Sequence, residues 1–186
     1  GNVKIFAKLI EKGARIHYQY HRSGTALHSA INSASSSVSP VRILQMCQIY
    51  LNPPNGNLPD DERRKLVNIV NLNGHTPLMS AAKNGLHEVV TLLLDNQADI
   101  SAATEKGNDA LLTAAINGHL QTVTVLLERG ADVNKKNAAD RTALMEALDS
   151  KQLKDSPDTV LAMIEAFNVH LAQAGGMKNL TDDKDK

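Results

Sequence analysis

Hydrophobic and polar positions along this chain form short helical patterns that are separated by turn residues. Leu78, Ala81 and Ala82 follow the i, i+3, i+4 spacing, which predicts a short helix with one apolar face. A second apolar run at 88–94 predicts another helix. Gly85 lies between the two and can end the first helix, because glycine adopts positive φ at little cost. The pattern therefore predicts a unit of two short helices.

This unit recurs along the chain with a period of 33 residues. Aligning 71–103 with 104–136 gives 12 identical positions out of 33, where chance would give about two. A fixed period of this length is typical of repeat architectures. The identical pairs are Gly74/Gly107, Leu78/Leu111, Ala81/Ala114, Ala82/Ala115, Asn84/Asn117, Gly85/Gly118, Val90/Val123, Thr91/Thr124, Leu93/Leu126, Leu94/Leu127, Ala98/Ala131 and Asp99/Asp132.

The same frame extends in both directions. The run Thr-Ala-Leu-Met at 142–145 lies two periods after Thr-Pro-Leu-Met at 76–79, whereas Thr-Ala-Leu-His at 25–28 precedes the latter by one period plus 18 residues. About five extra residues fall in the Ser-rich 33–40 and about thirteen in 52–64, and their Pro, Gly, Asn and Ser content predicts loops. The long second loop would be either a specificity element or a disordered segment.

These motifs resemble the ankyrin repeat, a 33-residue turn plus two helices with a Thr-Pro-Leu-His-x-Ala signature. Here the signature reads Thr-Pro-Leu-Met-Ser-Ala at 76–81 and Thr-Ala-Leu-His-Ser-Ala at 25–30. The family's closing run Gly-Ala-Asp-Val-Asn stands at 130–134. The resemblance covers roughly 1–170 and implies an all-α ankyrin-repeat solenoid of stacked helix–turn–helix units with hairpin-like loops between them.

We expect one domain over 1–176. Thr76 is predicted to cap its helix, with Asp109 replacing the usual Thr in the next unit. In the last helix Val160, Met163, Ile164, Phe167 and Leu171 form the predicted apolar stripe. The helix predicted at 3–12 has no first helix before it, so we expect the parent protein to continue upstream. The predicted units are a partial unit 1–18, unit one at about 19–70 with loop insertions at 33–40 and 52–64, unit two 71–103, unit three 104–136 and unit four 137–175, with a polar tail at 177–186.

Composition supports thin helical layers and narrows the function. Apolar residues make up 42% of the chain but aromatic residues only 3%, so Leu, Val, Ile and Ala must fill the core. Twenty basic residues balance twenty acidic ones, which disfavours a nucleic-acid partner. The chain has no run of 18 apolar residues, and we expect no membrane association. The single cysteine, Cys47, is expected to be a buried thiol in a reducing, cytoplasmic compartment.

We expect no catalysis, no cofactor and no metal. The seven histidines show no helical i, i+4 pair of the kind that zinc sites use, since His17 and His21 fall in a predicted hairpin. His28 occupies the motif position at which the family uses histidine in a local hydrogen-bond network. No strand–turn–helix elbow exposes a serine, and no Gly-x-Gly-x-x-Gly loop is present.

The resemblance implies that a protein partner binds the concave side, through the hairpin tips and the exposed face of each first helix. We expect a monomeric binding module; the alternative is the interaction domain of a bacterial effector, delivered into a host cell, that docks a host protein. Leu72 and Ile116 are predicted to face water and to form the dry centre of the site. The candidate residues are His21, Arg22, Asn32, Leu72, Asn73, His75, Lys83, Asn84, Ala103, Glu105, Lys106, Asn108, Ile116, Asn117, Lys136, Ala138, Ala139, Arg141 and Asp149.

Overall fold

The computed structural model describes residues 24–36, 38–53, 58–150 and 157–173, together with positions 4, 8 and 12. Within these ranges the regular elements are helices, and an isolated bridge joins Lys136 to Thr142. The partial unit predicted at 1–18 and the polar tail at 177–186 lie outside the described residues, apart from those three positions.

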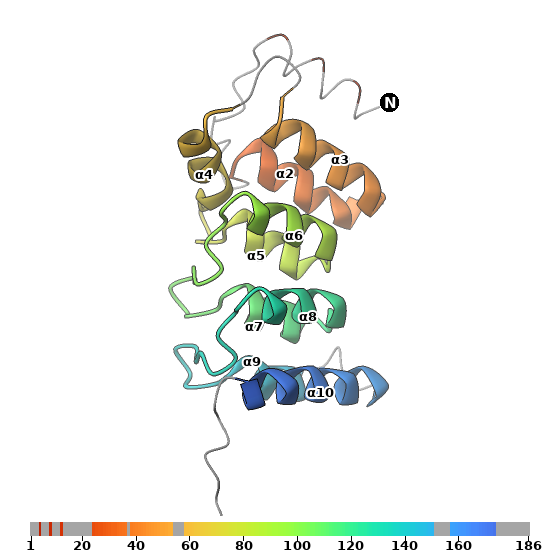
Figure 1. Ribbon diagram of the computed structural model, residues 1–186, viewed down its shortest axis with the longest axis vertical. Helices are drawn as coiled ribbons and strands as arrows, with labels where there is room; N and C mark the ends of the chain where they lie inside the picture. The colour runs from red at the N-terminus through yellow and green to blue at the C-terminus, as the bar shows by residue number, and fades with distance from the viewer. Residues whose placement is uncertain are drawn as a thin grey trace, which may run out of the picture.

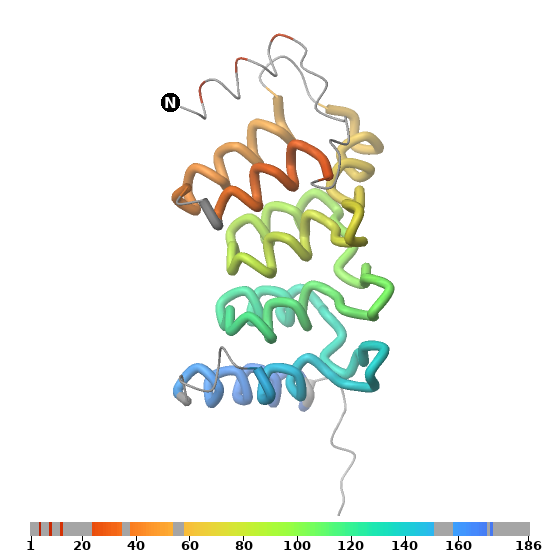
Figure 2. Tube along the Cα trace, turned by 180° about the vertical axis from the view of Figure 1, so that it is seen from behind, coloured from red at the N-terminus to blue at the C-terminus, as the bar shows by residue number. Residues whose placement is uncertain are grey.

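Helix pairs stack in four tiers along the long axis of the molecule (Figure 1). First helices pack on first helices and second helices on second helices, so the tiers form two rows. Figure 2 shows the same tiers from behind. The first helices are α2 (Ala26–Asn32), α5 (Pro77–Lys83), α7 (Ala110–Ile116) and α9 (Ala143–Asp149); the second helices are α3 (Pro40–Leu51), α6 (His87–Asp95), α8 (Leu120–Glu128) and α10 (Pro157–Gln173). The predicted all-α solenoid is confirmed.

The predicted helix caps are present. The Thr76 hydroxyl accepts a hydrogen bond from the Met79 N–H at 3.2 Å, and Pro77 occupies the first helical position, where no donor is needed. The Asp109 carboxylate accepts from the Leu112 N–H at 2.9 Å, which is the same role with a different side chain. The cap residues therefore fix where each first helix begins.

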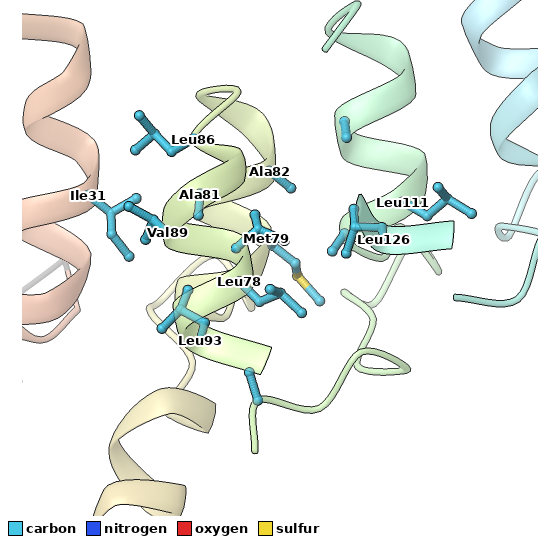
Figure 3. Packing of buried hydrophobic residues seen from close by; sticks show 14 of the residues in the cluster. Ile31, Leu78, Met79, Ala81, Ala82, Leu86, Val89, Leu93, Leu111 and Leu126 are labelled. Atoms are coloured by element: carbon cyan, nitrogen blue, oxygen red, sulfur yellow. The ribbon is translucent and has the colours of Figure 1, made fainter. Parts of the chain in front are cut away.

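One continuous core runs through the tiers. Leu93 and Leu126, one period apart on the second helices, are both fully buried and belong to one cluster with Leu78 and Leu111 of the first helices (Figure 3). This continuity confirms the predicted dry spine, since each tier covers an apolar face that its neighbour cannot cover alone. Cys47 is buried as expected, and burial raises the pKa of its thiol to about 12.

The last helix bears out part of its predicted stripe. In α10, Met163 and Phe167 are buried, while Val160 and Ile164 are half-buried. The side chain of Leu171 lies outside the described residues.

The predicted loop insertions are partly helical, which corrects the sequence interpretation. Within 33–40, Ser33–Ser36 form a 3₁₀ turn, η2, and Pro40 already begins α3. Within 52–64, helix α4 (Asp60–Asn68) starts at Asp60. Three acidic residues in the first turn of α4 favour its formation, because they complement the positive end of the helix dipole.

Arg63 and Asn68 hold α4 in place. The Arg63 guanidinium donates to the carbonyls of Leu51 at 3.3 Å and Leu58 at 2.9 Å. The Asn68 amide donates to the Gln97 carbonyl at 3.0 Å and accepts from the Asp99 N–H at 2.7 Å. The helix is thereby bonded to both unit one and the turn after α6.

Candidate interaction surface

Three hairpin loops project from one side of the helical tiers, on the left in Figure 1. They span 71–75, 104–108 and 137–141, and are called hairpins two, three and four after their units. Each is closed by a backbone hydrogen bond between its end residues, at 2.9, 3.0 and 2.9 Å. The position next to the tip adopts positive φ, as Gly74, Gly107 and Asp140. The 33-residue period therefore sets out one hairpin per unit.

The predicted partner-binding residues lie on these hairpins and at the ends of the first helices. Their binding role stays a prediction, but their exposure is defined. His21 and Arg22 lie outside the described residues. The exposed residues are Asn32, Leu72, Asn73, Lys83, Ala103, Glu105, Lys106, Lys136, Ala138, Ala139 and Asp149, and the half-buried ones are His75, Asn84, Asn108, Ile116, Asn117 and Arg141.

A cavity of about 520 Å³ lies between hairpins two and three. This volume falls within the range of about 300–1,000 Å³ that is typical of ligand pockets. Thr104 and Gly74 line the cavity but were not among the predicted site residues. They could have been found from the sequence, because they lie beside predicted residues on the same two loops. The cavity is lined by Leu72, Asn73, Gly74, His75, Thr104, Glu105, Lys106 and Asn108.

Leu72 and Ile116 lie at different places on the repeat unit, and their role as one apolar centre stays a prediction. Leu72 is 72% exposed at the tip of hairpin two, where it lines the cavity. Ile116 is only partly exposed, packs against the core and does not line that cavity. It is the last residue of α7, about 9 Å along the helix from the first. The hairpin end and the helix end are thus two separate parts of the surface.

Charges on this side differ between units. In unit four, Arg141 pairs with Glu146 at 3.3 Å and with Asp149, and Lys136 pairs with Asp140 at 2.9 Å. Within the described part of the chain, no ion pair is formed by three exposed residues of units two and three, which are Lys83, Glu105 and Lys106. These three charges remain available to a partner.

His28 anchors hairpin two to the first tier. Its Nε2–H donates to the His75 carbonyl at 3.0 Å, while its Nδ1 accepts from the Thr25 N–H at 3.3 Å. Burial lowers the pKa of His28, and burial followed by the nearby Lys83 lowers that of His75. The neutral form of His28 is the one that these two bonds fit, so the ring has the structural role that the resemblance implied.

In the part of the chain that the structure describes, no group of three His, Cys, Asp or Glu side chains is placed to hold a metal ion. None of the helices in these ranges combines the length and the apolar character that crossing a membrane requires.

The repeat architecture is matched by comparison with known families. A model for ankyrin repeats (3 copies) matches residues 1–104, 44–137 and 101–171. These matches together span residues 1–171 of the 186, so the chain belongs to the ankyrin-repeat family. Ankyrin repeats are in general modules for protein–protein interaction. No curated protein matches the chain.

Proposed function

We propose that this chain is a monomeric protein-binding module that holds a partner protein on the hairpins and first-helix ends of units two to four. The proposal is supported by the cavity between hairpins two and three, because six of its eight lining residues are ones that the resemblance implied for the binding side. Repeat arrays use their extended concave faces for binding, and no catalytic role is proposed.

The charges of units two and three favour a partner surface with acidic character. Two exposed cations, Lys83 and Lys106, form no ion pair among the described residues. In units two and three Glu105 is the one candidate acidic residue of which the same is true. Charge complementarity of this kind affects the association rate and the choice of partner more than affinity. In the described residues, no observation favours the alternative of a bacterial effector.

The test is capture of partners from lysate on the immobilised chain, followed by affinity measurement with the captured protein. We expect the double variant Leu72→Arg/Lys83→Glu to bind at least about tenfold more weakly, because it places a charge on the exposed apolar residue and reverses a free cation. Its helical circular dichroism should be unchanged, since both side chains are exposed.

Val41→Arg is the matched control, because Val41 is also a largely exposed apolar residue, 60% accessible, but lies on α3 in the row of second helices. It should bind like the wild type. Equal affinity for all three proteins would remove the hairpin side from the binding site.

A further inference from the structure

Hairpins three and four are joined by a backbone hydrogen bond that hairpins two and three lack. The Ala138 N–H donates to the Lys106 carbonyl at 2.9 Å. The equivalent groups one period earlier are the Glu105 N–H and the Asn73 carbonyl, and no hydrogen bond joins them. A donor and an acceptor that pair in one junction are therefore both free in the next.

The two junctions also differ in spacing. A Cβ placed on Gly107 would lie 2.9 Å from the Cα of Asn137 in hairpin four. A Cβ placed on Gly74 would lie 3.9 Å from the Cα of Thr104 in hairpin three. Hairpins two and three are thus farther apart at equivalent positions, and the cavity of about 520 Å³ occupies the gap.

Hairpin three has a threonine where hairpins two and four have an asparagine, and this difference leaves a second backbone N–H without an acceptor. In hairpins two and four, the side-chain oxygens of Asn71 and Asn137 each accept from two backbone N–H groups of their own loop, at 2.9 and 3.1 Å. In hairpin three the Thr104 hydroxyl accepts only from the Asn108 N–H, at 3.3 Å. Across the described ranges, the Lys106 N–H and the Glu105 N–H have no protein acceptor.

The groups around the gap define its occupant. A peptide group carries both a donor and an acceptor, so one extended chain can pair with the Asn73 carbonyl and the Glu105 N–H together. Leu72 lines the same cavity with an exposed apolar side chain. Hairpin three carries Lys106 and Glu105, and Lys83 lies near the cavity residue His75, whose pKa is lowered by burial and then by the Lys83 ammonium. None of these three charges forms an ion pair in the described ranges, and the excess of cations favours an acidic chain over a basic one.

We propose that an extended, net acidic segment of a partner protein docks between hairpins two and three. Its main chain pairs with the Glu105 N–H and the Asn73 carbonyl, and one of its apolar side chains packs on Leu72. The inference rests on the proposed function and deepens it, because it names the kind of segment that binds and the atoms that hold it.

A pair of proline variants tests the free donor without any partner. Glu105 and Ala138 are the equivalent second residues of two tip turns, a position at which proline is favoured. Glu105→Pro should leave the melting temperature unchanged, since no hydrogen bond is lost. Ala138→Pro should lower it by about 2–4 °C, because it removes the bond to Lys106. Equal losses in both variants would contradict the proposal.

Binding is tested with a displayed library of short linear peptides, selected on the wild-type chain after subtraction on the Glu105→Pro variant. We expect net acidic sequences with an apolar residue that bind the wild type at least about tenfold more tightly than Glu105→Pro. Glu105→Ala is the matched control, because it removes the carboxylate but keeps the N–H, and it should bind these peptides at least as tightly as the wild type does.

Binding experiments can overturn the proposal as well. It fails if no peptide sequence survives the subtraction. It also fails if the wild-type chain self-associates and Glu105→Pro abolishes this association, which would assign the gap to a second copy. If a captured partner is released by Leu72→Arg/Lys83→Glu but binds Glu105→Pro normally, the inference fails and the proposed function stands. If neither variant affects that partner, both fail.

Discussion

At the scale of single residues, the side chains that replace the usual repeat residues bring their own partners. Asp109 stands where Thr76 and Thr142 cap the neighbouring first helices. Its side chain is only 6% exposed, and its second carboxylate oxygen lies 3.5 Å from the Lys135 ammonium. A buried carboxylate needs such a cation, whereas a threonine hydroxyl does not. The two residues therefore act as one pair.

This pair predicts a coupled effect on stability. Lys135→Met should lower the free energy of unfolding by about 1–2 kcal/mol, because it leaves the Asp109 carboxylate without its counter-charge. In an Asp109→Thr background the same change should cost much less. Urea unfolding of the four proteins of this double-mutant cycle measures the coupling, and additive effects would show that the residues act independently.

Histidine protonation sets a second prediction at this scale. Burial lowers the pKa of His28, so the unfolded chain takes up a proton at a higher pH than the folded one. The contribution is fully present above the unfolded pKa of about 6.5 and is lost as the pH falls through the lower, folded pKa. His75, whose pKa is also lowered by burial, adds an effect of the same sign.

We therefore expect the melting temperature to fall between about pH 7.5 and pH 5.5, and to fall less steeply in His28→Gln. Thermal unfolding at a series of pH values measures both slopes. Identical slopes in the two proteins would exclude His28 as a source of the pH dependence.

At the scale of helices, most elements were predictable because their apolar residues are regularly spaced. Elements held by irregular, long-range contacts were not predictable. Leu78 and Leu111 repeat their spacing with a cap before and a glycine after, so α5 and α7 follow from local signals. The first five residues of helix α4, 60–64, belong to the segment whose Pro, Gly and Asn content predicts a loop. Only Leu66 and Val67 of the helix are buried, so its sequence has little apolar periodicity to signal a helix. Its Asn68 contacts lie 29 and 31 residues away, beyond the reach of any local pattern.

Helix α8 has a buried polar residue at a position where the equivalent helix α6 has an apolar one. The Thr122 hydroxyl is buried and has no hydrogen-bond partner in the described residues, whereas the equivalent position of α6 is the buried Val89. A buried hydroxyl that makes no hydrogen bond lowers stability. The hydroxyl of Thr124 on the same helix differs, because it donates to the Leu120 carbonyl at 3.1 Å.

Thr122→Val should consequently raise the free energy of unfolding by about 1 kcal/mol. Thr124→Val, which loses a hydrogen bond, should be neutral or destabilising. Urea midpoints at unchanged m-value compare the two variants. A loss of stability in Thr122→Val would mean that a water molecule satisfies the hydroxyl.

At the scale of the whole molecule, the tiers are covered unequally. Met79 of α5 and Leu112 of α7 are 1% and 2% exposed, because the next tier packs on them. Met145, the equivalent residue of α9, is 47% exposed. We expect slower amide hydrogen exchange in α5 and α7 than in α9, since local opening is easier where fewer apolar contacts must break. Exchange followed by mass spectrometry would test this order, and uniform protection would contradict it.

The candidate surface was only partly predictable at this scale. The period placed Asn73, Glu105 and Lys106 on exposed loops, because every unit repeats the same turn. It did not predict the gap, which depends on Thr104 replacing an asparagine and on one backbone bond that forms in only one of two equivalent junctions. The position of the gap depends on differences between repeat units, and a pattern defined by what the units share does not include these differences.

The junction between units two and three is bonded at one end and open at the other. At the helix-turn end, the His119 Nε2–H donates to the Lys83 carbonyl at 2.9 Å, while hairpin two is tied to the first tier and hairpin three to the fourth. A mechanical load that bends the array should therefore part the hairpins at this junction, with His119 near the pivot. A partner segment held by both hairpins would therefore limit their separation under such a load.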